Sequence, residues 1–380
     1  MLINLKYLGV GGRLSKTLGE LLQNLSELQH LKVNTFTKFK WGKIGSWGKL
    51  QKLEKLNLIN LDDLNVVFGE VGAIAKLAPL PAGTFSALQC ISVFNCDKIK
   101  KLFSVSWLGY LQKLQTIEVF DCEQLEEIIK SEFEAGEKVI ALPNLESLRL
   151  IALPQLKSIY SGSSTVLICD SIKKIEIQDC DNIESVFWSG FNPLLNLEYL
   201  DLLHLENLKF LFDVGGLNLS PLVPHTSFFS LKEITVSRCH QLRKVLSHGW
   251  LLRYFQSLET VEVECRSQME ELISSSTHEE EKVTLPKLQS LKLIKLPALK
   301  SICNSSSVLI CDTIKSLEIV GCEKLRRIPL NFSLLDNAPS SHPLSLKKVV
   351  VYPKRWWESL EWDHPNAKDI LLPLCKFQQW

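Results

Sequence analysis

The sequence of 380 residues contains no hydrophobic run long enough to cross a membrane. Its first residues also lack the charged segment and long apolar run of a secretory signal. Charge of one sign is not in excess either, because the formal net charge is +1 and both signs are mixed along the chain. We therefore expect a protein that neither spans a membrane nor binds nucleic acid.

Motifs for metal, nucleotide and catalytic sites are also lacking. No C-x-x-C pair occurs, and Cys303 and Cys311 lie without convergent histidines, so no metal site is predicted. The glycines from Gly9 to Arg13 are not followed by the G-K-[ST] that a phosphate loop requires. The histidines are scattered through the sequence, and none has the surrounding motif of a catalytic nucleophile and its base. We expect no cofactor, no metal and no enzymatic activity.

The sequence instead contains a repeated leucine pattern. It is clearest at Leu288, Leu291, Leu293, Leu296 and Leu299, and residues 314–325 repeat it as I-x-x-L-x-I-x-x-C-x-x-L. A near-copy of this whole stretch occupies residues 142–183. The pattern L-x-x-L-x-L-x-x-(L/C)-x-x-L is the signature of leucine-rich repeats.

The spacing predicts how each repeat folds. Leu291 and Leu293 face one way and Lys292 the other, because side chains alternate along a β-strand. One unit cannot bury its own leucines, whereas stacked units form a continuous core. The sequence therefore predicts an α/β-type leucine-rich-repeat solenoid, which is a curved arc. Short parallel strands would line its concave face, with irregular loops and short helices on its convex face.

The repeats span most of the chain. Thirteen units start at Leu5, Leu28, Leu53, Leu88, Leu114, Leu145, Ile172, Leu197, Leu231, Leu258, Leu288, Ile314 and Leu346. From Leu28 onward, units pair at offsets of 142 to 144 residues, which indicates that a block of five repeats was duplicated. We predict one array over residues 1–355 and a tail over 356–380 that packs on the last coil. Because Leu5 follows no polar cap, we also expect the N-terminus to be a cut within a longer array.

The cysteines follow the repeats as well. The slot two residues after the strand holds cysteine in some units (Cys96, Cys122, Cys180, Cys239 and Cys322) and leucine in alternating ones (Leu61, Leu153, Leu205 and Leu296). This position points inward, so we predict buried structural thiols. The total of eleven cysteines is odd, which favours a reduced, intracellular chain. Arg266 occupies this slot in one unit, and we expect a local irregularity there.

The strand residues between the leucines are the candidate binding surface. Between Glu118 and Glu318 the central position holds five acids interrupted by two bases, and apolar residues often recur two positions later. Apolar residues rimmed by charge are typical of protein-binding surfaces, but the second column could equally pack against neighbouring coils. The candidate partner-binding residues are Phe94, Glu118, Phe120, Arg149, Glu176, Asp201, Glu262, Lys292 and Glu318.

The repeat style resembles one family. Units such as residues 114–129, with cysteine, alternate with units such as residues 142–159, and Glu-rich inserts separate them. Together with the tail from Trp356 to Leu374, this is similar to the C-terminal repeats of plant intracellular immune receptors. These are the coiled-coil nucleotide-binding leucine-rich-repeat (NLR) disease-resistance proteins. The coiled-coil and nucleotide-binding domains of that family have no counterpart here, so nucleotide exchange is assigned to no residue.

The resemblance implies a role in plant defence without catalysis. The repeats would form a protein–protein interaction solenoid that recognises a pathogen effector or a host protein altered by one. The nucleotide-binding domain of a longer receptor is a further candidate partner, and a cytoplasmic or nucleo-cytoplasmic location is implied. One alternative is an adaptor or substrate-receptor of a ubiquitin ligase, but nothing before Leu28 resembles its F-box helices. An extracellular receptor ectodomain would need a signal peptide and disulfide caps.

Overall fold

The computed structural model describes most of the repeat strands. The described residues are 4–12, 22, 25–34, 50–61, 64–68, 83–130, 138–160, 165–188, 196–213, 230–247, 255–264, 268–274, 283–303, 309–310, 313–328, 345–362 and 366–378. The chain divides into two compact units. Unit 1 comprises Met1–Ile183 with Trp188–Leu194, and unit 2 comprises Glu184–Phe187 with Leu195–Trp380.

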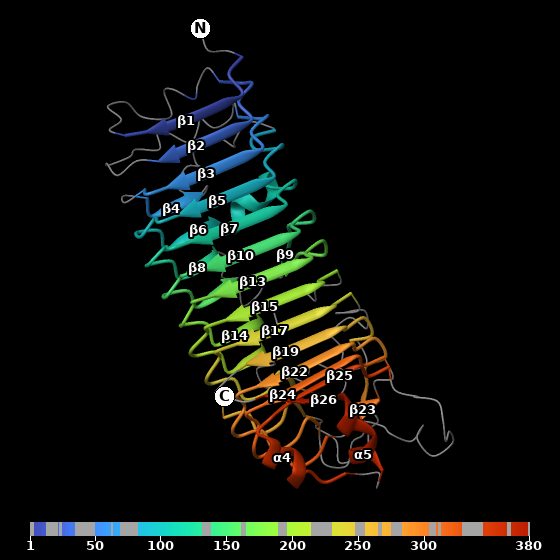
Figure 1. The fold of residues 1–380 in the computed structure, drawn as a ribbon. Coiled ribbons are helices and arrows are strands. Elements are labelled where there is room, and N and C mark those ends of the chain that lie inside the picture. The colour runs from blue at the N-terminus through green and yellow to red at the C-terminus, as the bar shows by residue number, and fades with distance from the viewer. Residues whose placement is uncertain are drawn as a thin grey trace. The chain divides into compact units, whose positions relative to one another are not determined.

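Unit 1 is built on seven main-sheet strands, which Figure 1 shows as successive arrows. They are β1 (Tyr7–Gly11), β2 (His30–Asn34), β3 (Lys55–Ile59), β5 (Cys90–Phe94), β7 (Thr116–Phe120), β10 (Ser147–Ile151) and β13 (Lys174–Gln178). Each pairs in parallel with the next, and residues at the same strand position stand opposite one another. Five columns of side chains therefore run across these strands.

Unit 2 repeats this arrangement with seven further strands (Figure 1). They are β15 (Tyr199–Leu203), β17 (Glu233–Ser237), β19 (Thr260–Glu264), β22 (Ser290–Ile294), β24 (Ser316–Val320), β25 (Lys348–Tyr352) and β26 (Cys375–Phe377). The pairing is again parallel and in register.

The leucine pattern explains where these strands lie. A main-sheet strand begins two residues after each of the thirteen predicted repeat starts. From β2 to β25, the second and fourth residues of each main-sheet strand are buried, as with Leu291 and Leu293, while Lys292 between them is half-buried. The predicted leucine-rich-repeat solenoid with parallel strands is confirmed.

The side of the coils away from the main sheet is built mostly from short strands in the described part of the chain. In unit 1, β4 (Val66–Phe68), β6 (Lys101–Ser104), β8 (Glu127–Lys130) and β11 (Ser158–Tyr160) form a second parallel sheet, and β9 (Lys138–Ala141) pairs with β12 (Thr165–Ile168). Three further two-stranded pairs are β14 (Ser185–Trp188) with β16 (Phe210–Asp213), β18 (Leu246–Ser247) with β20 (Ile273–Ser274), and β21 (Val283–Thr284) with β23 (Leu309–Ile310).

Helices are few and short among the described residues. The 3-10 helix η2 (Val105–Tyr110) places Trp107 in the core of unit 1. The Trp107 ring lies 5.1 Å from the ring of Phe68 between centroids, and Phe85 and Phe103 also pack against Phe68. These aromatic side chains pack η2 against the strands β4 and β6.

A left-handed residue follows the strand in many coils. Its φ angle lies between 50° and 55° at Asn60, Asn95, Asp121, Ala152, Asp179, His204, Arg238 and Lys295, and is 67° at Gly321. This conformation turns the backbone so that the residue's amide donates to the next coil. Asn60 N donates to Phe94 O at 3.0 Å, and Asn95 N donates to Phe120 O at the same distance. The sharp corner therefore continues the hydrogen-bond ladder beyond the strand.

The slot cysteines are buried at this same corner, as predicted for structural thiols. The Cys96 thiol donates to Phe94 O at 3.3 Å and reaches Leu58 O of the preceding coil at 3.9 Å. The equivalent pairs of carbonyls accept from Cys180, Cys239 and Cys322. A thiol fits here because it is small and apolar yet can donate a weak hydrogen bond. Arg266, where an irregular coil was predicted, lies outside the described residues.

The C-terminal residues contact the last two repeats. After α4 (Lys354–Ser359) come α5 (Ala367–Leu371), the 3-10 helix η4 (Leu372–Leu374) and β26, which pairs with β25. Trp356 Nε1 donates to Leu325 O at 2.6 Å, and the rings of Trp357 and Trp362 meet edge to face. The side chains of Trp356 and Trp357 are thereby buried at this end of unit 2.

Replacing Leu291 with Asp should unfold the coils around β22 locally. The side chain is 2% exposed, so the substitution would place an unpaired charge in the core. We expect a loss of several kcal/mol, on the order of the largest single-residue effects. Hydrogen exchange should increase over residues 285–325. Ser290→Asp, on the half-buried face of the same strand, is the control and should change exchange little; equal exchange in the two variants would contradict the assigned faces.

The slot thiols should resist alkylation while the protein is folded. Burial raises the pKa of Cys180 and of Cys322 to about 12, so almost no thiolate is present at neutral pH. With iodoacetamide at pH 8, mass spectrometry should find Cys180 and Cys322 unmodified until denaturant is added. The half-buried Cys90 serves as the internal comparison. Modification of Cys180 as fast as Cys90 in the folded protein would show that the slot is open to solvent.

Candidate interaction surface

The open face of the main sheet is formed by the first, third and fifth residues of its strands. In unit 1 the third residues align across β5, β7, β10 and β13 as Ser92, Glu118, Arg149 and Glu176. Arg149 lies between two acids: its Nη1 is 3.2 Å from Glu118 and its Nε is 3.2 Å from Glu176. Ser92 Oγ donates to the other oxygen of Glu118 at 2.9 Å. Three of the predicted site residues therefore form one ion-paired triad.

The charges of this triad are coupled. Burial alone would raise the pKa of Glu176, but hydrogen bonds from Arg149 and Lys174 outweigh it and hold that pKa below its usual value. Hydrogen bonding to Glu176 in turn raises the pKa of Arg149, against the opposing effect of burial. Because Glu176 has a side chain only 15% exposed, its charge depends on these partners. A Glu176→Lys substitution would place three cations together, so it would disturb the sheet as well as any partner.

Unit 2 carries the same column in its duplicated block. Asp201, Thr235, Glu262, Lys292 and Glu318 align across β15, β17, β19, β22 and β24. Lys292 Nζ lies 2.8 Å from Glu262, and this hydrogen bond is the main cause of its raised pKa, to which the charge of Glu318 adds. Each base is thus neutralised by acids on the adjacent strands. The predicted acidic stripe is therefore a set of ion pairs with acid in excess.

The fifth strand residues form an apolar column in unit 1, and this column contains the two predicted phenylalanines. The rings of Phe94 and Phe120 stack with centroids 4.7 Å apart and planes 2° from parallel. The Arg149 guanidinium carbon lies 5.3 Å from the Phe120 ring centroid. Ile59 on β3 and Ile151 on β10 extend the column on either side. All four side chains are half-buried, so each presents an apolar surface to solvent.

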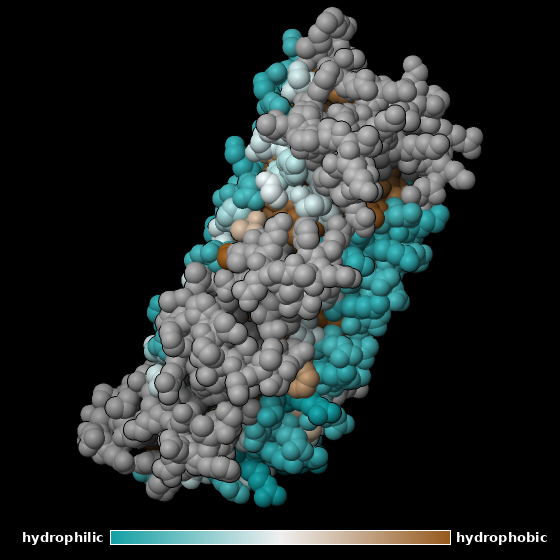
Figure 2. Space-filling model, turned by 180° about the vertical axis from the view of Figure 1, so that it is seen from behind, coloured by the Kyte–Doolittle hydropathy of each residue, from teal (hydrophilic) through white to brown (hydrophobic). Residues whose placement is uncertain are grey.

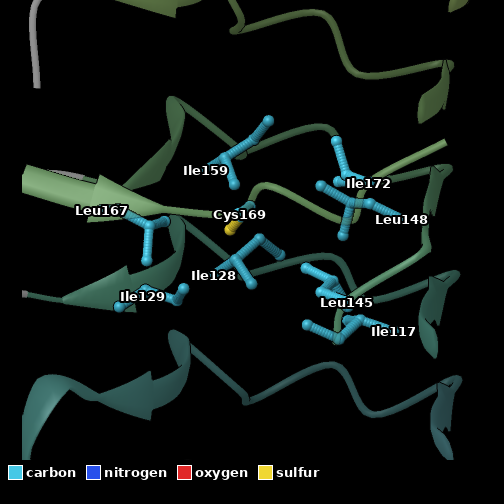
Figure 3. Close-up of a pocket in the computed structure, with 9 residues that line it drawn as sticks. All are labelled: Ile117, Ile128, Ile129, Leu145, Leu148, Ile159, Leu167, Cys169 and Ile172. Atoms are coloured by element: carbon cyan, nitrogen blue, oxygen red, sulfur yellow. The ribbon is translucent and has the colours of Figure 1, made fainter. Parts of the chain in front are cut away.

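The described hollows offer no better ligand site. Figure 3 shows a gap between the main sheet and the strands behind it, around Cys169. Its volume is about 10 Å³, and only aliphatic side chains and this thiol line it. A buried water needs several polar partners, so the gap is part of the apolar core. A wider polar hollow of about 430 Å³ lies on the second sheet, where Lys100, Lys130 and Glu126 face solvent.

The face shown in Figure 2, opposite to the view of Figure 1, is different in character. The described residues that reach its surface are mainly hydrophilic, and hydrophobic atoms show only in small areas between them. Ion pairs away from the main-sheet strands include Glu126–Lys157 in unit 1 and Glu270–Lys300 in unit 2, both at 2.8 Å. Among the described residues, the continuous apolar column therefore lies on the open face of the main sheet.

Two absences apply to the described residues alone. No helix among them is long and apolar enough to cross a membrane. No group of three or more histidine, cysteine, aspartate or glutamate side chains in the same ranges is arranged to hold a metal ion.

The chain is similar to plant resistance proteins. Residues 74–209 and 218–335 match the family model described as leucine-rich repeats of RPS2-like plant disease resistance proteins. Among curated relatives from Arabidopsis thaliana, disease resistance protein RPS5 is 28% identical over 166 residues, which are 42% of this chain and 17% of that protein. Disease resistance protein At4g27190 is 31% identical over 144 residues, 38% of this chain and 13% of the relative. The chain thus spans a small part of the length of these relatives.

Solved structures of leucine-rich-repeat proteins are also similar. A leucine-rich-repeat protein of Leptospira interrogans is 16% identical, with 99% of this chain and 96% of that chain covered and a TM-score of 0.39. An internalin of Listeria monocytogenes is 13% identical, with 96% and 88% covered and a TM-score of 0.32.

Replacing Arg149 with Met should raise the pKa of Glu176. The lowered pKa means that Glu176 contributes stability that is fully present above its unfolded pKa, near 4.5, and is lost as pH falls through its folded pKa. Without Arg149, this acid-side contribution should shrink. Carboxyl titration by NMR would measure the change. Lys157→Met is the control: it should raise the pKa of Glu126, which is lowered mainly by its hydrogen bond to Lys157, and leave Glu176 unchanged. An unshifted Glu176 in Arg149→Met would refute the triad.

Proposed function

Because the chain belongs to the leucine-rich-repeat family of RPS2-like plant disease resistance proteins, we propose that it is the recognition module of an intracellular immune receptor. In this proposal its open face binds a pathogen effector, or a host protein altered by an effector, and it performs no catalysis. The match over residues 74–335, interrupted only between 209 and 218, is the observation that carries the proposal. A cytoplasmic location is part of it.

The open face suits protein binding better than the other described surfaces. It presents half-buried apolar residues beside charged ones, and interfaces combine an apolar centre with a polar rim in this way. Parallel in-register strands also place residues from distant parts of the sequence in one plane, as with Glu118, Arg149 and Glu176. A partner lying across the strands would thus contact several repeats at once.

The duplication supplies matched variants for testing which side binds. On the open face, Glu118 and Glu262 are equivalent residues that pair with Arg149 and Lys292. On the opposite side, Glu126 and Glu270 are likewise equivalent and pair with Lys157 and Lys300. Replacing any of these glutamates with Gln removes one charge and breaks one ion pair. Because exposed pairs contribute little to stability, roughly 0–1 kcal/mol, all four variants should fold.

The experiment screens the full chain against arrayed plant-pathogen effectors and the host proteins that they modify. A true partner should lose affinity, by roughly tenfold, for Glu118→Gln or Glu262→Gln. It should bind Glu126→Gln and Glu270→Gln as tightly as the parent chain. If partners lose affinity only for Glu126→Gln and Glu270→Gln, the binding surface does not lie on the open face. Selective binding of ubiquitin-ligase subunits, with no effector or effector target bound, would favour the adaptor function instead.

A further inference from the structure

The two copies of the duplicated block share their central column and differ in the fifth. Glu118, Arg149 and Glu176 correspond to Glu262, Lys292 and Glu318, so the acid–base–acid order is kept. In the fifth column, Phe94 and Phe120 correspond to Ser237 and Glu264. Glu264 is paired there with Lys295 at 2.7 Å. Among the described strands, the stacked aromatic pair in the fifth column therefore belongs to unit 1.

The apolar column of unit 1 has defined ends. It consists of Ile59, Phe94, Phe120 and Ile151, and we refer to these four residues as the aromatic stripe. Asn34 precedes it on β2 and Gln178 follows it on β13. With strands about 4.8 Å apart, its four side chains span about 14 Å. That is the length of a short extended segment of about five residues.

The borders of the aromatic stripe are polar, with a small excess of acidic side chains. On one side, Asn95 Nδ2 donates to Asn60 Oδ1 at 2.6 Å, and the exposed Asp121 continues this row. On the other side lie Glu118 and Arg149, whose charge is already shared between Glu118 and Glu176. Asp179 and Lys174 flank the end at β13. Acidic side chains thus outnumber basic ones around the apolar centre.

We propose that the aromatic stripe binds an extended segment of a partner protein that carries apolar side chains flanked by lysine or arginine. The inference rests on the proposed recognition function and specifies its site and the chemistry of the partner. Aromatic residues at the centre of an interface contribute most of its affinity, and charge complementarity selects basic flanks. The stack is already formed, so binding immobilises few further side chains.

The test exchanges the residues that distinguish the two blocks. Phe94→Ser with Phe120→Glu gives unit 1 the residues that unit 2 carries, at positions where strands accommodate them. Ser237→Phe with Glu264→Phe makes the reverse exchange, between Leu203 and Ile294 in the same column. Ile151→Thr is a milder variant that keeps a β-branched residue, and Ile294→Thr in unit 2 is its matched control. Thermal melting and hydrogen exchange confirm that each variant is folded.

The probe is a phage-displayed library of random dodecapeptides, selected on the full chain. Enriched peptides should combine apolar residues with Lys or Arg, and their affinity, measured by fluorescence polarisation, should fall with added salt. They should bind the Phe94→Ser, Phe120→Glu variant roughly tenfold or more weakly, and Ile151→Thr more weakly than Ile294→Thr. The reverse exchange should create a second binding site.

Three outcomes would overturn the inference. In the first, no selected peptide binds the parent chain more tightly than the variant that combines Phe94→Ser with Phe120→Glu. In the second, the selected peptides are acidic. In the third, neither that double variant nor Ile151→Thr weakens peptide binding. If peptides or screened partners lose affinity for Glu262→Gln but not when Phe120 is replaced, the aromatic stripe is not the binding site, although the open face still binds the partner. If the proposed function fails, the partners' affinity will instead be unchanged by substitutions at both Glu262 and Phe120.

Discussion

The hydrogen-bond connection from each coil to the next is the constraint on which the structure depends. No coil can bury its leucines alone, so each must follow its neighbour at the spacing of a parallel sheet. The left-handed residue after the strand maintains this connection at the corner, where Asn60 and Asn95 donate to the coils that follow. For residues such as Ala152 and Lys295 this conformation costs roughly 1–2 kcal/mol. The cost is tolerated because the alternative is an unpaired buried amide.

The cysteine slot is explained by the same corner. Gln178 O accepts from Ala152 N of the preceding coil and also from the thiol of Cys180, two residues later in its own coil. Ser237 O accepts in the same way from His204 N and Cys239. A carbonyl has two lone pairs, and the thiol uses the second without adding a polar group that needs water.

Most of the main-sheet strands could be predicted from the sequence because the leucine spacing indicates which residues are buried. Every main-sheet strand up to β25 was located from leucine positions, since the L-x-L step fixes which residues face inward. The left-handed corners were missed, although Asn60, Asn95, Asp121 and Asp179 offered a signal, as Asn and Asp favour that conformation. Strand β26 was missed because C-K-F lacks the repeat pattern.

The ion pairs and the aromatic stack could not be obtained from spacing alone. They depend on the register between strands that lie about thirty residues apart in the sequence. The leucine spacing places Glu118, Arg149 and Glu176 at the same strand position, but only pairing in register brings Arg149 within 3.2 Å of both acids. The same register converts Phe94 and Phe120 from two scattered residues into one apolar surface.

The central column and the fifth column of the open face contribute to binding in different ways. Half-exposed ion pairs such as Glu262–Lys292 contribute roughly 0–1 kcal/mol and already satisfy one another. Because acids exceed bases in the central column, its charge attracts a basic partner and repels an acidic one, and loss of one glutamate charge weakens that attraction. Apolar surface has no such competing interaction, since its burial releases water whichever side chain covers it. Affinity should therefore concentrate where the duplicated blocks differ, at Phe94 and Phe120, while the charged column that they share sets which partners can approach.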